Sequence, residues 1–338
     1  MINPFDSVKV LCWRDKIEEI LQGRIPSPVA VEIDPSNLCT QSCEWCMFKK
    51  FKAQCMVSLS KEIMFSLIEN LAEMEVKAIT FTGGGEPLVN PITPEAMQLA
   101  HGAGIQVGLV TNGDLLEKDG IRDVVTQVCR YVRLSIDAGR DETYYKLKHP
   151  KHLDQLSRNL KSIKVMAETG FKGDIGTAFL IHPKTAAELP IIIERLEGIG
   201  VNYLQVRPCL GVKLTSETVN YCRDAVESYR GKLNIYANFK RFDEVRFGMM
   251  FEKCRATPLL GIVCADAKMY LCCQFRGNRK YVIGDLTKSS FKEQWGKKRH
   301  LQVLRRINIA KCPPCRYSMF NQLIENVFIK DKMHKNFI

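Results

Sequence analysis

The chain has 338 residues, of which 46% are hydrophobic and 25% charged, a balance that excludes a disordered, collagen-like or coiled-coil protein. No stretch approaches the roughly 18 apolar residues of a membrane-spanning helix, and the acidic, mixed start does not resemble a secretion signal. We therefore expect a cytoplasmic protein without a membrane segment. The net charge of +12 favours anionic partners such as phosphorylated metabolites or nucleic acid and does not choose between them. Because no basic block stands out, a solvated basic surface is the simpler interpretation, and a nucleic-acid partner is not expected.

Short apolar, β-branched runs alternate with amphipathic stretches over the first two thirds of the chain, which predicts βαβ units and a parallel sheet. The predicted strands span residues 29–33, 78–82, 106–110, 131–136, 175–181 and 203–206. Parallel strands covered by helices favour a barrel or part of one, with functional residues in the loops after the strands.

Three helices between these strands have recognisable boundaries. Ser60 is the expected N-cap of the clearest one. A second carries periodic apolar residues from Leu153 onward and ends at Gly170, where glycine can take a left-handed conformation. A third is expected near residues 185–197, where Thr185 and Glu188 resemble a capping box but Pro190 removes a backbone donor just inside, which leaves its start open.

Domain organisation follows from where this alternation stops, near residue 210, and where cysteines gather, from residue 254. The expected segments are an N-terminal extension (1–28), a barrel (29–210), a connecting segment (211–253), a cysteine-rich subdomain (254–320) and a C-terminal helix or tail (321–338).

Cysteine is the residue type that narrows the function most. Fourteen cysteines in a protein expected in a reducing compartment point to metal binding rather than to disulfides. Cys39, Cys43 and Cys46 form one tight group after the first predicted strand. Three thiolates can hold three irons of a four-iron cluster and leave the fourth iron open, as catalytic metal sites do.

This Cys-x3-Cys-x2-Cys spacing resembles that of the radical S-adenosylmethionine (radical SAM) family. The glycine stretch from Gly83 to Glu86, after the second strand, lacks the ending of a nucleotide P-loop and is similar to the Gly-Gly-Glu motif of that family. The resemblance implies an α/β fold, namely a partial (β/α)6 TIM-like barrel with a small C-terminal Cys-rich iron-sulfur subdomain. It also implies S-adenosylmethionine (SAM) as a cofactor, with a SAM-binding [4Fe-4S] cluster on the three cysteines.

The resemblance further implies SAM contacts at successive strand ends. Residues expected to contact SAM are Trp45, Gly84, Gly85, Glu86, Asn112, Ser135 and Asp137. Trp45 is expected near the adenine, and the glycine motif near the methionyl ammonium group. Turn capping explains Asn112 equally well and Asp137 better.

The C-terminal cysteines resemble the twitch subdomain of SPASM/twitch radical SAM enzymes, which holds one auxiliary [4Fe-4S] cluster. The expected ligands are Cys254, Cys272, Cys312 and Cys315. Cys264 and Cys273 are surplus, and either could replace Cys272; Ala267 stands where the family usually has glycine. A structural zinc site of four cysteines is the alternative.

Four residues at strand ends are candidates for substrate contact or catalysis: Glu32, Asp34, Arg207 and Cys209. The layout resembles that of 2-deoxy-scyllo-inosamine dehydrogenase-like enzymes, in which the first strand contributes polar contacts to substrate. Cys209 could instead donate a hydrogen atom, as epimerases of the family require. Salt bridges at the barrel rim and a buried filler cysteine are the structural alternatives.

Taken together, these features predict an enzyme that cleaves SAM to a 5′-deoxyadenosyl radical and abstracts hydrogen from a small polar metabolite. A sugar, aminocyclitol or nucleotide sugar would be dehydrogenated or epimerised, with flavodoxin or ferredoxin as electron donor. Modification of a ribosomal peptide or a protein side chain is the main enzymatic alternative, disfavoured because only 28 residues precede the first predicted strand. A non-catalytic iron-sulfur or zinc protein that binds nucleic acid is the alternative from another class.

Overall fold

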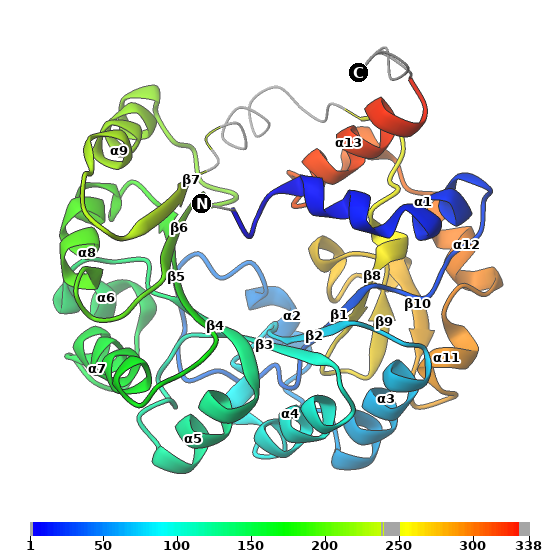
Figure 1. The fold of residues 1–338 in the computed structure, drawn as a ribbon, viewed down its shortest axis with the longest axis horizontal. Helices are drawn as coiled ribbons and strands as arrows, with labels where there is room; N and C mark the ends of the chain where they lie inside the picture. Colours follow the sequence, from blue (N-terminus) through cyan, green and yellow to red (C-terminus); the bar gives the residue numbers. More distant parts are fainter. Residues whose placement is uncertain (1–2, 238, 240–250, 331–338) are drawn as a thin grey trace.

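The computed structural model describes residues 3–237, 239 and 251–330, and one curved sheet organises this part of the chain (Figure 1). Its strand order is β10-β9-β8-β1-β2-β3-β4-β5-β6-β7. The strands are β1 Ala30–Ile33, β2 Ala78–Phe81, β3 Gln106–Thr111, β4 Cys129–Ser135, β5 Asp174–Ile181, β6 Tyr203–Pro208, β7 Asn234–Ala237, β8 Leu260–Val263, β9 Lys268–Tyr270 and β10 Val282–Asp285. Strands β8, β1 and β2 to β7 pair in parallel, and β8, β9 and β10 pair antiparallel.

Helices α3 to α9 lie on the convex side of the sheet, while α11 and α12 flank the C-terminal strands (Figure 1). The helices are α1 Arg14–Leu21, α2 Lys49–Gln54, α3 Lys61–Glu73, α4 Thr93–Gly102, α5 Asp119–Val128, α6 Asp141–Lys148, α7 Gln155–Glu168, α8 Leu189–Leu196, α9 Ser216–Ser228, α11 Phe291–Gln294, α12 Lys298–Arg305 and α13 Ser318–Phe328. In the described part of the chain, no helix combines the length and apolar character that crossing a bilayer requires.

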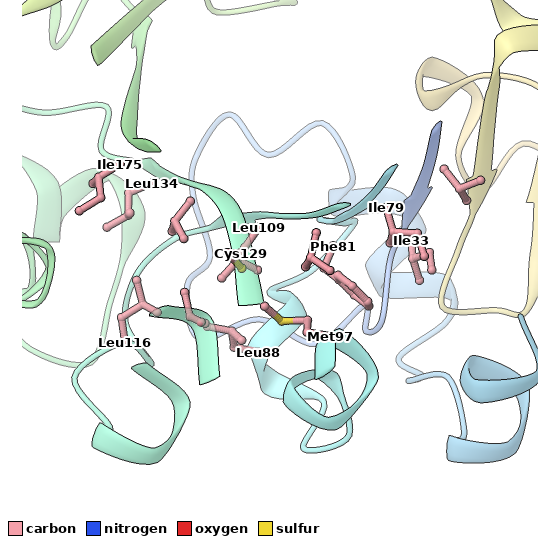
Figure 2. Close-up of a cluster of buried hydrophobic side chains, with 14 of the residues drawn as sticks. Ile33, Ile79, Phe81, Leu88, Met97, Leu109, Leu116, Cys129, Leu134 and Ile175 are labelled. Carbon is pink, nitrogen blue, oxygen red and sulfur yellow. The ribbon is translucent and has the colours of Figure 1, made fainter. Parts of the chain in front are cut away.

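The main core lies between the sheet and these helices. Alternate strand residues such as Ile79 and Phe81 of β2 point toward the helices and are buried. Figure 2 shows side chains of neighbouring strands, including Leu109 and Leu134, on the side of the sheet where Met97 of α4 also lies. Because side chains alternate along a strand, the intervening residues face the concave side.

Two predicted helix boundaries are confirmed. Ser60 caps α3, its hydroxyl accepting a hydrogen bond from the Ile63 N–H at 3.3 Å. Gly170, just after α7, has a φ of +82°, the left-handed conformation that favours glycine.

Helices lie where the other two were predicted, in α7 and in the 3-10 turn Ala186–Glu188 followed by α8, but one detail of each prediction is wrong. Leu153 lies before α7 and is 58% exposed. Thr185 makes no capping hydrogen bond with its side chain, and the predicted partner Glu188 accepts hydrogen bonds from the backbone N–H groups of Gly139 and Arg140. Thr185 and Glu188 have the residue types of a capping box, but they do not form one.

The six predicted strands correspond to β1 to β6, but the sheet continues at both ends. Within 211–253, α9 and β7 add a parallel strand beside β6, whereas residues 238 and 240–250 lie outside the described residues. At the other end, β8 pairs with all of β1, from Ala30 with Leu260 to Ile33 with Val263. The cysteine-rich segment thus continues the barrel sheet. Of the predicted 321–338 segment, only residues up to 330 are described, most of them in α13.

Candidate active site and cysteine pocket

The three N-terminal cysteines lie in the loop that follows β1 and come close together there. The backbone N–H of Cys46 donates to the Cys43 carbonyl at 3.2 Å, which closes a turn. Burial, opposed by the charge of Lys148 and assisted by the nearby Cys39 and Cys46 thiols, raises the pKa of Cys43 to about 11. The last turn of α6 holds the loop, because the N–H groups of residues 42 and 44 donate to carbonyls of residues 148 and 147.

These thiols fit a cluster better than a single ion. Among the described residues, no group of three or more His, Cys, Asp or Glu side chains is placed to hold one metal ion. A [4Fe-4S] cluster does not need such convergence, because each thiolate binds a different iron. The assignment of a SAM-binding cluster to these three cysteines therefore stays a prediction. Burial also raises the pKa of Cys39, so iron binding must displace protons from this loop.

The glycine stretch after β2 packs directly on the cysteine loop. A Cβ added to Gly85 would lie 2.1 Å from the Leu38 carbonyl oxygen, and one added to Gly84 would lie 2.7 Å from Asn37 Oδ1. At Gly85 the clash is with backbone, so glycine is required there for the two loops to meet, whereas at Gly84 the Asn37 side chain would have to shift.

Glu86 connects this stretch to β3. Its carboxylate accepts hydrogen bonds from the Thr111 hydroxyl at 2.6 Å and from the Asn112 backbone N–H at 2.8 Å. Burial raises the pKa of Glu86 to about 7. The carboxylate therefore fastens two strand ends together, and its predicted contact with SAM stays a prediction.

Asn112 reaches from the end of β3 to the cysteine loop. Its amide nitrogen lies 2.8 Å from Thr40 Oγ1 and 3.8 Å from Cys39 Sγ. Hydrogen bonds to a ligating sulfur tune a cluster. The predicted residue is thus beside the candidate cluster site, where it also closes its own turn by accepting from Asp114 N–H.

Lys148, at the end of α6, organises the end of β4 and was not predicted. Its side chain is only 2% exposed, and its ammonium donates to the Ser135 carbonyl at 2.6 Å and pairs with Asp137 at 3.0 Å. Burial opposes the charge, but Asp137 raises the pKa of Lys148 above its ordinary value. Asp137 has a φ of +57° and also accepts from the Leu180 N–H, so both of its oxygens are engaged. The charge of Lys148 acts on Cys43 as well.

Trp45, in the cysteine loop, lies beside the end of β5. Its ring lies 4.9 Å from the ring of His182, the residue that follows β5. Burial lowers the pKa of His182, so its neutral form is favoured. An aromatic pair of this kind provides a flat surface for a purine ring, and His182 is a second residue that the sequence analysis missed.

The four predicted C-terminal ligands line one pocket. Its cysteines are Cys254, Cys272, Cys312 and Cys315. Apolar side chains such as Phe275 and Ile307 form much of the remaining wall. Burial raises the pKa of Cys312 to about 11 and that of Cys315 to about 12. Four thiols in an apolar wall would suit a buried iron-sulfur cluster, and the choice between that cluster and the zinc alternative stays a prediction.

The surplus cysteines lie elsewhere. Cys264 follows β8 and is fully buried, where the charges of Asp34 and Arg276 act on it. Cys273 adjoins Cys272 in sequence but does not line the pocket. Ala267, which replaces a glycine of the family pattern, has a φ of +57°, so the position does require the left-handed conformation that glycine adopts without strain.

Glu32 and Asp34, the predicted substrate contacts of β1, are buried in ion pairs. Glu32 Oε2 lies 2.7 Å from Arg276 Nη2, and Glu32 also pairs with Arg316. Asp34 Oδ2 lies 2.8 Å from Arg276 Nε. Burial alone would raise the pKa of Glu32, but Arg316 and Arg276 lower it to about 2. Since Arg316 adjoins Cys315, these pairs join the first strand to the cysteine pocket.

Arg207 and Cys209 lie at the end of β6. Arg207 pairs in register with Leu180 of β5, on the concave side. Cys209 is buried, and burial raises its pKa to about 12, with Asp137 close enough to add to the shift. A thiol held protonated keeps its hydrogen atom.

The fold and the cysteine loop together define the class of protein. Residues 33–196 match the family model described as the Radical SAM superfamily. The match covers just under half of the chain and supports membership of this superfamily, whose members use a [4Fe-4S] cluster and SAM, and the predicted fold class is confirmed.

Three similar proteins illustrate the range of relatives. The chain is 28% identical over 186 residues to GTP 3′,8-cyclase of Chlorobaculum tepidum, covering 53% of each protein. It is 30% identical over 146 residues to an S-adenosylmethionine-dependent nucleotide dehydratase of Flammeovirga pacifica, covering 41% of this chain and 49% of the relative. The chain thus spans about half the length of these curated relatives. The structure of Streptococcus suis SuiB bound to precursor peptide SuiA has a TM-score of 0.69 at 14% identity over 91% of this chain and 73% of SuiB, which shows a shared fold.

Proposed function

We propose that this radical SAM enzyme is an oxidoreductase that removes a hydrogen atom from a small polar metabolite, such as a sugar, aminocyclitol or nucleotide sugar, and dehydrogenates it. The observation that carries the proposal is the second cysteine pocket beside the concave face of the barrel, which Arg316 links to β1 through Glu32. When bound, SAM and its cluster supply a 5′-deoxyadenosyl radical, and a second cluster supplies a one-electron acceptor.

In this proposal, the cysteines would hold the two clusters, and other residues of the chain would position them. Cys39, Cys43 and Cys46 would hold the SAM-binding cluster, and the four pocket cysteines would hold the auxiliary cluster. Glu86 and Asn112 would fix the loops around the first site. A flavodoxin or ferredoxin would deliver the electron that starts each turnover.

Epimerisation is the second candidate, because Cys209 is a protonated thiol at the end of β6. A thiol in that position could return a hydrogen atom to a substrate radical. Peptide modification is a further alternative, which the shared fold of SuiB at 14% identity and the 21% identity over 185 residues to a PqqA peptide cyclase of Granulibacter bethesdensis support.

The test is anaerobic incubation of the reconstituted protein with dithionite and SAM. Formation of 5′-deoxyadenosine above a Cys43→Ala control is expected, and its absence would overturn the proposal. Incubation with candidate sugars in deuterated water then separates the two reactions. Solvent deuterium in the product would indicate thiol-mediated epimerisation, whereas an oxidised product without deuterium would indicate dehydrogenation.

A further inference from the structure

The concave face of the sheet carries two arginines on strands that are not adjacent. In β4, Val132 and Leu134 belong to the core against the helices, so Arg133 between them faces the concave side. In β6, Leu204 and Val206 belong to the same core, so Arg207 also faces the concave side. Both guanidinium groups therefore lie where a substrate in the barrel would be held.

Structural contacts show that the two arginines share one neighbourhood. Arg133 Nη1 donates to Gln205 Oε1 at 3.2 Å, and Gln205 precedes Arg207 by two residues on the same face of β6. The charges of both arginines also act on the phenol of Tyr203. Gly176 of β5 leaves room for the Tyr203 ring, since a Cβ at Gly176 would lie 2.0 Å from that ring.

Arg133 has a charge that nothing in the described part of the chain neutralises directly. The carboxylates Glu32 and Asp34 pair with Arg276 and Arg316. None of the ion pairs among residues 3–237, 239 and 251–330 includes Arg133, although its side chain is more than nine-tenths buried, with 8% exposed. Its Nε is buried and makes no hydrogen bond there.

Burying a guanidinium without an anion is unfavourable unless a ligand supplies the anion. Because Nη1 faces Gln205, the opposite edge, which includes Nε, is available. That edge has the fork geometry that binds a carboxylate or phosphate through two parallel hydrogen bonds.

We propose that the substrate carries an anionic group, a phosphate or a carboxylate, that binds the Nε edge of Arg133, with Arg207 as a second cation. This inference rests on the proposed function and names the substrate class of that site. Arg133 lies two residues before the end of β4, roughly 7 Å below the edge where the cysteine loop lies. The anionic end of the substrate therefore points into the barrel, and its reacting carbon points toward the SAM site.

The test is isothermal titration calorimetry at 0.15 M salt. It uses the whole 338-residue chain, reconstituted and saturated with SAM. The probes are inorganic pyrophosphate and succinate. Wild type is expected to bind one of them, and Arg133→Gln to bind it at least tenfold more weakly, with Arg133→Lys losing less. Arg230→Gln is the matched control, because Arg230 is exposed and donates to backbone carbonyls of residues 227 and 229.

Each outcome decides the proposal. Binding of pyrophosphate alone would identify a phosphorylated substrate, and binding of succinate alone a carboxylate. No binding of either probe to wild type, or wild-type affinity in Arg133→Gln, would overturn it. If circular dichroism shows that Arg133→Gln is misfolded, Arg207→Gln takes its place with the same expected loss. Wild-type 5′-deoxyadenosine is measured separately, so failure of the proposed function is distinguished from failure of the anion site.

Discussion

Replacement of Gly85 by alanine tests the packing between the glycine stretch and the cysteine loop. The new Cβ would lie 2.1 Å from the Leu38 carbonyl oxygen and 2.7 Å from that of Ser36. A carbon and an oxygen in contact are normally more than 3 Å apart, so the loops must separate by about 1 Å. Both neighbours are backbone atoms, which cannot rotate away as a side chain would.

The expected cost follows from this geometry. Overpacking a core costs about 1–3 kcal/mol when side chains can adjust, and here we expect at least about 3 kcal/mol because they cannot. Since the cysteine loop must move, the affinity for SAM is expected to fall together with stability.

Urea unfolding of the anaerobic, reconstituted protein measures the stability, and equilibrium dialysis measures SAM binding. The matched control is Gly120→Ala in α5, where a Cβ would meet nothing within 4 Å. Alanine is favoured over glycine in a helix by about 0.5–1 kcal/mol, so the control is expected to be at least as stable as wild type. A Gly85→Ala protein with the urea midpoint and SAM affinity of wild type would refute the reasoning.

Four further predictions concern other parts of the structure. Cys272→Ala is expected to reduce the iron content from about eight to about four per chain, whereas Cys264→Ala keeps about eight; equal contents in a colorimetric assay would refute the ligand assignment. Ala267→Gly is expected to raise the free energy of unfolding by about 1 kcal/mol, because it relieves a left-handed alanine; a lower urea midpoint would contradict this. Lys148→Met leaves the buried carboxylate beside it unpaired and is expected to cost about 3–5 kcal/mol, and a cost below 1 kcal/mol would show that the pair contributes little. Glu86 has a folded pKa of about 7, above its usual 4.5, so its contribution to stability is complete below pH 4.5 and is lost as the pH rises toward 7; melting temperatures of Glu86→Gln should lack that decline.

Much of the fold was predictable because its signals are local. Runs of β-branched residues mark β1 to β6, and the spacing of Cys39, Cys43 and Cys46 within a single loop could be read without any tertiary contact. The glycines of the next loop were predictable for the same reason, since their type alone indicates a close approach of backbone.

The rest depends on contacts between distant segments. Strand β7 is a short run of half-buried residues without an apolar pattern. Lys148 looks like an exposed helix residue until α6 packs against the end of β4. Spacing could not choose between Cys264 and Cys272, because the β8–β9 turn directs one toward Asp34 and the other into the pocket. Glu32 and Asp34 form ion pairs with arginines more than 200 residues later in the sequence, and no local pattern indicates that.

The pairing of β8 with β1 has a consequence during synthesis. The partner of β1 on that side emerges from the ribosome about 230 residues later, which corresponds to a delay of roughly 10–50 s at ordinary rates of translation. Throughout that interval one edge of the nascent sheet is an open template for other chains. We therefore expect yield in the cell to depend on chaperones and on growth temperature, and shortened chains that end before residue 260 to aggregate.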